Sequence, residues 1–219
     1  KALNYLVENN FKYSKKLLKF TNDNKIKFVY ASSGSVYGNT KKEMKETQKL
    51  NEKNVENYYG LSKLMFDQHV MKNKKKLRSV IGLRYFNVYG MNEFHKKKMS
   101  SPILSFYDQI KKKNNCKIFG DYDGFEKGEH TRDFVYIDDV VDINLWASKK
   151  KMVNIFNVGT GNSNSFKKIA NLVIQKLKRG KIDYIKFPEK FKGKYQSFTK
   201  ADISKIKNFR RFIFDFNKF

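Results

Sequence analysis

The chain has 219 residues, 40% of them hydrophobic and 16% aromatic, which is enough for one domain with a full core, or for one domain and part of a second. Its formal net charge of +26 would attract polyanions of any kind. Because this charge comes mainly from dispersed Lys, whereas bases and phosphates are recognised by bidentate Arg, we expect no dedicated nucleic-acid partner and assign the charge a role in attracting an anionic diphosphate.

The first half of the chain has a strand–helix–strand pattern. Residues 1–20 have helical spacing, and residues 27–38 predict a buried strand that runs into a turn of small residues. Residues 80–90 repeat this arrangement after an intervening helix. Two strands joined in this way form a crossover unit of a parallel sheet, so the hydroxyl groups that end the first strand lie at the carboxyl edge of the sheet.

The intervening helix carries Tyr59 and Lys63, which are four residues apart and therefore share one face. An ammonium beside a phenol favours the ionised phenol, so a group with an ordinary pKa of ~10 could act as a base near neutral pH. The alternative is an amphipathic helix that happens to carry both residue types. The pair taken alone leaves this alternative open.

The second half of the chain alternates strands and helices. Pro102 lies in the first turn of one predicted helix, where it is tolerated, and Asp138 or Asp139 is placed to cap another and to interact favourably with its dipole. Arg132 borders a charged loop and could bind a phosphate. The predicted elements are helix 100–113, strand 117–120, loop 121–131, a strand that runs into a helix over 132–142, strand 153–158, helix 166–178 and strand 182–187, with the tail 208–219 unassigned.

Several kinds of site are disfavoured by what the chain contains. Cys116 is the single cysteine, which rules out an intrachain disulfide and is more typical of an inert residue than of a nucleophile. His69, His95 and His130 have no metal-ligand spacing, so we expect no metal site. No run of 18 apolar residues and no signal peptide is present in the sequence, so we expect no membrane partner and a cytoplasmic location.

The strand-end, helix and second-strand segments together resemble the extended short-chain dehydrogenase/reductase family of nucleotide-sugar enzymes, with Ser33, Tyr59 and Lys63 at matching positions. The resemblance implies that Tyr59 exchanges the proton of a sugar hydroxyl while hydride moves to or from a nicotinamide. It also implies that Lys63 holds the cofactor ribose and lowers the pKa of Tyr59, and that Ser33 hydrogen-bonds the reacting oxygen. The alternative for Ser33 is an ordinary strand-end turn.

Further segments look like the ADP-heptose 6-epimerases within this family, and the likeness runs from about Asn9 to Asp202. These segments are 95–101, 132–136, 144–146, 155–161 and 187–199. The resemblance implies a homo-oligomer that carries NADP, or NAD, and takes an ADP-sugar as its substrate. It would convert ADP-D-glycero-D-manno-heptose to ADP-L-glycero-D-manno-heptose at C6, by transient oxidation and reduction, for lipopolysaccharide core precursor synthesis.

Inversion requires proton exchange on both faces of the sugar, so a second acid/base residue is expected. Lys96 matches it by resemblance, and the alternative for Lys96 is a solvated basic loop. The expected cofactor-binding residues are Lys63, Tyr59, Asn9, Val88 and Lys96. The expected substrate-binding residues are Ser33, Asn87, Phe119, Gly120, Asp121, Tyr122, Arg132 and Tyr195. The chain departs from the pattern at Met91, Lys98 and Ser105, where the family usually has Pro, Ser and His, and these departures bear on catalytic competence rather than on the fold.

We therefore expect an α/β fold, a partial Rossmann-type doubly wound parallel sheet with a smaller α/β substrate domain. Residues 1–90 would form the C-terminal part of a dinucleotide-binding domain, and residues 91–219 mainly the substrate domain, with some segments returning to the Rossmann core. The phosphate-binding strand, glycine-rich turn and helix are not found in the right context, because a loop leading into a helix, capped by Ser163 or Ser165, explains the glycines of 159–161. We expect the first nucleotide-binding half to be absent from this sequence.

Two kinds of alternative stay open. Within the same superfamily, the chain could be a hexose 4-epimerase or a 4,6-dehydratase acting on a nucleotide sugar. A dehydratase usually places an Asp-Glu pair just after the strand-end hydroxyl residue, where this chain has Gly34 and Ser35. From another class, the chain could be a non-catalytic relative or a basic binding module that uses its Lys-rich faces.

Overall fold

A three-stranded parallel sheet forms the centre of the larger part of the structure. The computed structural model describes residues 2–209, without the side chain of Lys98. Strands β1 (Phe28–Ser33), β2 (Val80–Tyr85) and β6 (Val153–Val158) lie side by side in the order β1-β2-β6, and both pairings are parallel. The parallel α/β sheet predicted from the strand–helix–strand pattern is confirmed.

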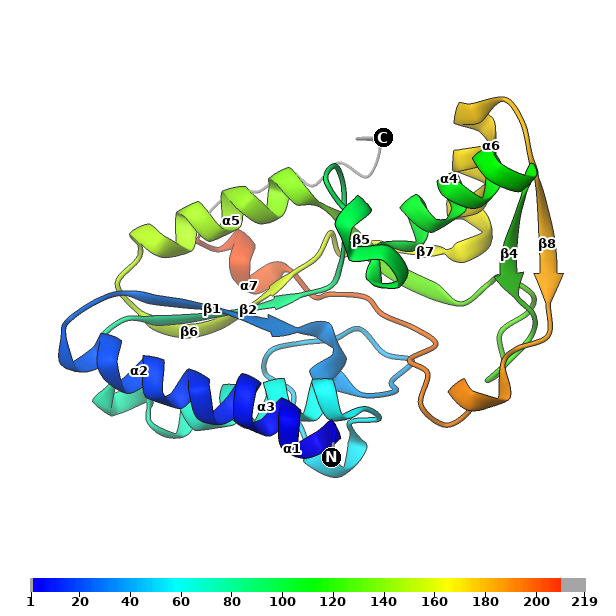
Figure 1. Cartoon of the computed structure of the whole chain (residues 1–219). Helices are drawn as coiled ribbons and strands as arrows, with labels where there is room; N and C mark the ends of the chain where they lie inside the picture. The colour runs from blue at the N-terminus through cyan, green and yellow to red at the C-terminus, as the bar shows by residue number, and fades with distance from the viewer. Residues whose placement is uncertain (1, 210–219) are drawn as a thin grey trace.

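Helices cover both faces of this sheet, with α1, α2 and α3 on one face and α5 on the other (Figure 1). The helices of this part are α1 (Ala2–Leu6), the π-helical turn η1 (Val7–Lys12), α2 (Tyr13–Asp23), α3 (Tyr58–Lys72), α5 (Ile137–Lys149) and α7 (Ser204–Lys207). Short 3-10 turns lie at η2 (Gly34–Tyr37), η3 (Glu52–Asn54) and η4 (Lys74–Lys76). The helix predicted over residues 1–20 is confirmed, with the π-helical turn as an addition.

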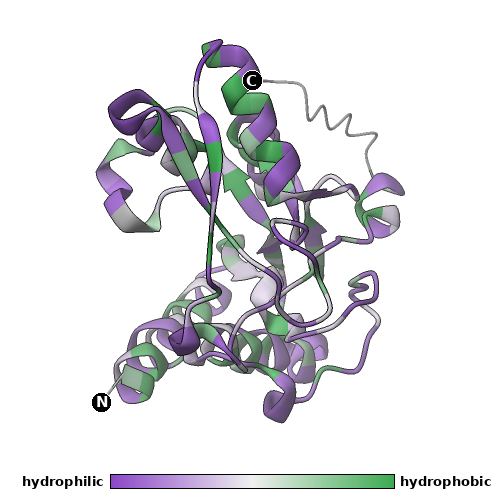
Figure 2. Cartoon of the chain, turned by 90° about the vertical axis from the view of Figure 1, so that its right-hand side faces the viewer, coloured by the Kyte–Doolittle hydropathy of each residue, from purple (hydrophilic) through white to green (hydrophobic). Residues whose placement is uncertain are grey.

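Apolar side chains hold these layers together. Phe66 and Val70 of α3 pack with Leu18 of α2 and Tyr30 of β1, while the other side of the sheet is covered by Trp146 of α5. Full burial of a side chain of this size stabilises the fold by about 1.5–3 kcal/mol. Figure 2 shows hydrophobic and hydrophilic positions interleaved along the helices, which is the pattern expected of elements with one buried face.

The smaller part of the structure is built on two short sheets. Strand β5 (Thr131–Tyr136) pairs in parallel with β3 (Asn87–Tyr89) and antiparallel with β7 (Ser163–Ser165), and β4 (Asn115–Phe119) pairs in parallel with β8 (Lys181–Ile185). Helices α4 (Pro102–Lys113) and α6 (Phe166–Leu177) pack with them, and 3-10 turns lie at η5 (Phe94–Met99) and η6 (Glu189–Phe191).

Two local predictions were wrong, and one is confirmed. Helix α5 begins at Ile137 with Tyr136 as its N-cap, so Asp138 and Asp139 do not cap it, but they lie in its first turn, where a negative charge interacts favourably with the helix dipole as predicted. Cys116 is buried within β4, which begins at Asn115 rather than at residue 117, because the pairing with β8 extends over the whole segment. The predicted cap of the helix after residues 159–161 is confirmed, since the Ser165 hydroxyl accepts a hydrogen bond from Lys168 N at 3.2 Å.

The tail that the sequence leaves unassigned, 208–219, lies outside the described residues from 210 onward. Among residues 2–209, no helix has both the length and the apolar character needed to cross a membrane.

Candidate active site

The carboxyl end of β1 presents a fixed serine hydroxyl. Ser33 ends the strand and caps the 3-10 turn η2, and its Oγ accepts hydrogen bonds from Ser35 N at 3.2 Å and from the Ser35 hydroxyl at 2.9 Å. A third hydrogen bond joins Ser33 to the side chain of Tyr59. Because two donors already occupy Ser33 Oγ, its own O–H is the group that donates to the Tyr59 oxygen.

Helix α3 brings Tyr59 to this hydroxyl. The helix begins after Asn57, whose side chain accepts from Gly60 N at 2.7 Å, so the helix start is fixed one residue before the Tyr58-Tyr59 pair. A Cβ atom at Gly60 would lie 2.8 Å from Ser35 O. Glycine at this position therefore permits the close approach of α3 to the η2 turn that the contact between Tyr59 and Ser33 requires.

Lys63 lies one turn further along α3. Its Nζ is 5.7 Å from the centroid of the Tyr59 ring and donates a hydrogen bond to Ala31 O at 3.0 Å. Burial lowers the pKa of Lys63, and the charge of Asp67 opposes this change. The structure thus brings Ser33, Tyr59 and Lys63 together at one edge of the sheet.

The electrostatics of Tyr59 differ from the expectation. Burial raises the pKa of the Tyr59 phenol, and the hydrogen bond from Ser33 acts in the opposite direction. The predicted lowering of this pKa by Lys63 is not found, because the ammonium lies over the ring and bonds to Ala31 O rather than to the phenol oxygen. The chain by itself therefore holds Tyr59 as a neutral phenol at pH 7.

The donors at this edge fit the ribose and nicotinamide of a dinucleotide. An ammonium has three N–H groups, and the hydrogen bond from Lys63 to Ala31 O uses one, so the others can reach a pair of ribose hydroxyls. Tyr59 is 45% exposed, which leaves its phenol accessible to a substrate. Asn9, a predicted cofactor residue, bonds back to Tyr5 O at 2.8 Å within its own helical segment. Its neighbour Asn10 instead donates to Ser62 Oγ of α3 at 3.0 Å.

A second group of predicted residues surrounds a cavity of about 300 Å³ between α4, β4 and the segment that carries Tyr195. Phe119, Ser105 and Tyr195 line it. The Arg132 guanidinium lies 4.9 Å from the centroid of the Tyr195 ring and 5.4 Å from that of Phe166, and burial lowers the pKa of Arg132. A planar cation held in this way suits a phosphate or a carboxylate.

The cavity and the Ser33 turn are linked by Gln196. Its Nε2 donates to Gly38 O at 2.7 Å and lies 3.4 Å from Gly34 O, so the residue after Tyr195 is bound to the η2 turn that follows Ser33. This contact joins the two groups of predicted residues. It was missed in the sequence because a long-range glutamine–carbonyl bond has no local pattern.

The remaining predicted substrate and cofactor residues lie along the edge strands and the loop after β4. Asn87 and Val88 lie in β3, in register with Phe134 and Val135 of β5. Gly120 N donates to Ile185 O at 2.7 Å, and the Tyr122 hydroxyl accepts from Gly193 N at 2.7 Å. Asp121 lines a separate surface pocket with Lys127 and Tyr184. Within the short segment 119–122, Phe119 therefore lines the cavity, whereas Asp121 lines the outer surface.

Lys96 lies apart from the Ser33–Tyr59–Lys63 group. It belongs to η5, is exposed, and its Nζ is 3.7 Å from Glu93 Oε2. Among the described residues, no hydrogen bond or ion pair joins Lys96 to Tyr59. Glu93 is buried and also accepts from Gly90 N at 3.0 Å and from Ser101 N at 2.7 Å, so it anchors the loop that carries Lys96.

Lys97, next to Lys96, has a strained backbone. Its φ of 50° and ψ of −117° belong to a region that glycine occupies and that residues with a side chain avoid. Replacing Lys97 with Gly should raise the free energy of unfolding by about 1 kcal/mol, measured by urea denaturation, because the strain is removed. His95→Gly, at an exposed position of η5 with helical backbone, is the matched control and should lower the same quantity by about 0.5–1 kcal/mol. A loss of stability in both variants would contradict the strain at Lys97.

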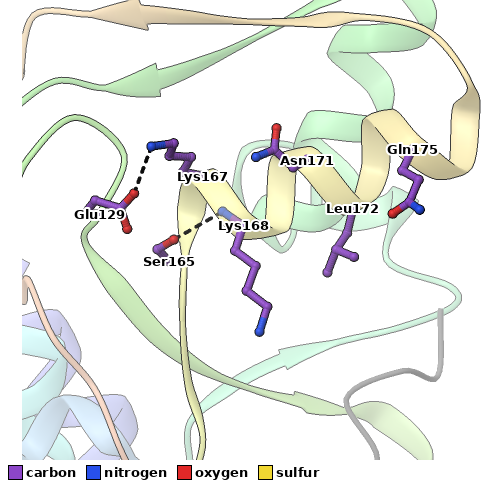
Figure 3. A pocket seen from close by; sticks show the side chains of 7 residues that line it. All are labelled: Glu129, Ser165, Lys167, Lys168, Asn171, Leu172 and Gln175. Carbon is purple, nitrogen blue, oxygen red and sulfur yellow. Dashed lines mark hydrogen bonds and ion pairs between the residues drawn. The ribbon is translucent and has the colours of Figure 1, made fainter.

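A shallow pocket of about 320 Å³ lies at the start of α6 and contains none of the predicted site residues (Figure 3). Lys167 forms an ion pair there with Glu129 at 3.3 Å, both side chains being partly exposed. Within residues 2–209, no group of three or more His, Cys, Asp or Glu side chains could hold a metal ion.

The fold and the site together define a class of protein. Helices cover both faces of a parallel sheet, and a phenol, an ammonium and a hydroxyl meet at its carboxyl edge, which is the place where open α/β sheets of the Rossmann type bind their ligands. The chain belongs to the NAD dependent epimerase/dehydratase family, whose model matches residues 1–159.

Several solved structures are similar to this chain. It is 34% identical to ADP-L-glycero-D-manno-heptose-6-epimerase from Helicobacter pylori, with a TM-score of 0.80 over 93% of this chain and 60% of that one. It is 27% identical to UDP-glucose 4-epimerase from Thermotoga maritima, determined with UDP-glucose, with a TM-score of 0.76 over 92% and 63% of the two chains. The dTDP-glucose 4,6-dehydratase from Bacillus anthracis, in complex with NAD, shares the fold at 21% identity, with a TM-score of 0.76 over 92% and 61%. The chain spans less than two thirds of each of these proteins.

Proposed function

We propose that this chain carries the proton-transfer site of a nucleotide-sugar epimerase that converts ADP-D-glycero-D-manno-heptose to its L-glycero epimer at C6. The observation that carries the proposal is the meeting of Ser33, Tyr59 and Lys63 at the carboxyl edge of the sheet, linked through Gln196 to the cavity beside Arg132. The 34% identity to the Helicobacter pylori heptose epimerase supports this substrate over other nucleotide sugars.

In this proposal the two parts of the chain have different tasks. Residues 1–90 supply the nicotinamide edge of a dinucleotide-binding domain, and residues 91–219 supply mainly the surface for the sugar nucleotide. Arg132, stacked on Tyr195, faces the diphosphate, which a guanidinium recognises through two parallel hydrogen bonds. The strongly positive chain attracts the same anionic substrate from solution.

Each residue at the sheet edge has one role. A bound nicotinamide dinucleotide, NADP or NAD, supplies a reversible hydride acceptor. After losing its own proton to water, Tyr59 would take the proton of the sugar hydroxyl as the hydride leaves C6. When the hydride has come back to the opposite face, the oxygen would take a proton from Lys96, and both side chains would then restore their protons by exchange with water. The Ser33 O–H, which donates to the Tyr59 oxygen in the free chain, would turn to the reacting oxygen, and Lys63 would bind the ribose hydroxyls. Lys96 serves as the second acid/base residue for the other face, and in the free chain it is paired with Glu93.

The test is an assay of the full chain with three sugar nucleotides and with NADP and NAD in turn. We expect proton NMR to show interconversion of the two ADP-heptose epimers, without net consumption of the dinucleotide. Turnover of UDP-glucose to UDP-galactose, or water loss from dTDP-glucose, with ADP-heptose unchanged, would replace the proposal with another epimerase or with a dehydratase. A protein that binds the dinucleotide and turns over none of the three would contradict an enzymatic role on these substrates.

A further inference from the structure

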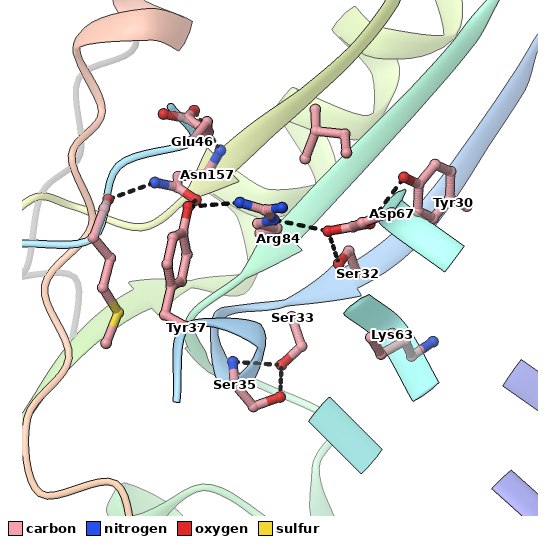
Figure 4. A network of polar contacts seen from close by, with 12 residues as sticks. Tyr30, Ser32, Ser33, Ser35, Tyr37, Glu46, Lys63, Asp67, Arg84 and Asn157 are labelled. Atoms are coloured by element: carbon pink, nitrogen blue, oxygen red, sulfur yellow. Dashed lines mark hydrogen bonds and ion pairs between the residues drawn. The ribbon is translucent and has the colours of Figure 1, made fainter. Parts of the chain in front are cut away.

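Asp67 is a buried carboxylate that the roles above do not use. It lies on α3 one turn after Lys63, and the residue is 1% exposed. Three donors surround it: the Tyr30 hydroxyl at 2.9 Å, the Ser32 hydroxyl at 2.9 Å and Arg84 Nε at 2.8 Å (Figure 4). Tyr30 and Ser32 belong to β1 and Arg84 to β2, so this one side chain ties α3 to two strands of the sheet.

The ion pair continues across the sheet. Arg84 Nη1 donates to the Tyr37 hydroxyl at 2.9 Å, and that hydroxyl donates to Asn157 Oδ1 of β6 at 2.7 Å. Burial raises the pKa of Tyr37 to about 12, so Tyr37 is a neutral donor throughout the physiological range. The network therefore runs from α3 through β1 and β2 to β6, beneath the edge where Ser33 lies (Figure 4).

Asp67 lies on the same face of α3 as two of the site residues. Tyr59, Lys63 and Asp67 follow one another at intervals of four along α3, and Ser32, which Asp67 binds, is the neighbour of Ser33. The bonds of Asp67 thus fix how far along β1 the helix lies, and hence whether Tyr59 meets Ser33. A buried ion pair is a poor means of gaining stability compared with apolar packing, which points to a purpose beyond holding the helix.

We propose that Asp67 is a positioning residue for the proton-transfer site: it sets α3 against β1 so that Tyr59 meets Ser33, and it places a negative charge one helical turn from the Lys63 ammonium. This inference rests on the proposed function for its catalytic consequence, but not for its effect on Lys63.

The surroundings of Lys63 make Asp67 the source of that charge. From its own helix, Lys63 faces Tyr59 and Asp67; from β1 it meets Ala31 O, and η1 contributes the uncharged Asn10, which binds the neighbouring Ser62. Among the described residues, Asp67 is the acidic group whose charge favours protonated Lys63, opposing the effect of burial. Arg84, on the far side of Asp67, compensates the carboxylate without contacting Lys63.

The test measures the titration of Lys63 in the full chain without substrate. Lysines are labelled with a trace of acetic anhydride over a range of pH, and mass spectrometry of the Lys63 peptide gives the midpoint of its reactivity. Asp67→Asn removes the charge, and because it leaves Arg84 unpaired and could unfold the chain, the double variant D67N/R84Q removes both charges. We expect the Lys63 midpoint to fall in D67N, so that labelling below the midpoint rises several-fold. In D67N/R84Q the midpoint should fall by less, because the loss of the more distant Arg84 charge acts in the opposite direction.

The controls separate charge from packing and from activity. Asp142→Asn, on an exposed position of α5, should leave the Lys63 midpoint unchanged, and Ser32→Ala, which keeps the Asp67 charge, should move it far less than D67N. In an active enzyme, D67N/R84Q should lower kcat at least tenfold with KM for the sugar nucleotide within twofold. An unchanged Lys63 midpoint in both charge variants overturns the inference, even where the wild type is active. A wild type without turnover would contradict the proposed function. The Lys63 titration would then still decide whether Asp67 acts on Lys63.

Discussion

Replacing Tyr59 with Phe should lower kcat for sugar-nucleotide epimerisation by about 10²–10⁴ while the chain stays folded. Tyr59 contacts Ser33 at the open edge of the sheet, and its phenol is the group that we propose to exchange a proton with the sugar hydroxyl. The substitution removes only a hydroxyl from a half-exposed ring, so the free energy of unfolding should fall by no more than about 1 kcal/mol. The measurement is NMR turnover of the nucleotide sugar, with a urea melt of the same sample.

Tyr58 offers the matched control. It precedes Tyr59 on α3, is 56% exposed, and is turned from the Ser33 contact by its place in the helix. Tyr58→Phe should therefore retain turnover within a factor of about two. Equal losses in both variants would assign the effect to the start of α3 rather than to proton transfer, and full turnover in Tyr59→Phe would remove the phenol from the mechanism.

The sequence was informative where local spacing decides the geometry. An i,i+4 pair on a helix that follows a strand ending in hydroxyl residues is sufficient to place Tyr59, Lys63 and Ser33 at one edge, because helix periodicity and parallel-sheet topology fix all three positions. The same logic could have found Asp67, since it is the next i+4 position on the same helix. A buried carboxylate on the face that packs against β1 is the signal for it.

The sequence was uninformative about features of the site that depend on burial or on long-range contacts. The direction of the Tyr59 pKa shift depends on how far the phenol is buried and on where the Lys63 ammonium points, and neither follows from spacing. The different partners of Asn9 and Asn10 depend on the π-helical turn η1, in which the two side chains point in different directions. The bond from Gln196 to the turn after Ser33 joins residues 158 apart in the chain and has no local trace.

Replacing Asp133 with Ala should lower the free energy of unfolding by about 3–5 kcal/mol, the largest loss of stability we expect from one side chain. Asp133 is fully buried at the middle of β5. Its Oδ1 accepts from Thr160 N and Thr160 Oγ1, both at 2.7 Å, and its Oδ2 accepts from Gly161 N at 2.9 Å and Ala201 N at 3.0 Å. Alanine would leave the three backbone N–H groups without an acceptor, whereas the Thr160 hydroxyl keeps Asn162 O at 3.3 Å. A buried donor without an acceptor costs about 1–3 kcal/mol.

The consequence extends to the site because Asp133 follows Arg132 and binds the segment that continues from Tyr195. The loss of the Ala201 bond removes one of the hydrogen bonds that hold that segment to β5, beside those of Thr131 with Ser197 and Thr199, so Asp133→Ala should also raise KM for the nucleotide sugar at temperatures where the variant is folded. Asp142→Ala, an exposed carboxylate on α5, is the control and should change the free energy of unfolding by less than about 0.5 kcal/mol. Equal urea midpoints for the two variants would show that the four hydrogen bonds to Asp133 contribute little, and the link between β5 and the cavity would then come from the backbone bonds of Thr131 with Ser197 and Thr199 and from the packing of Arg132 on Tyr195.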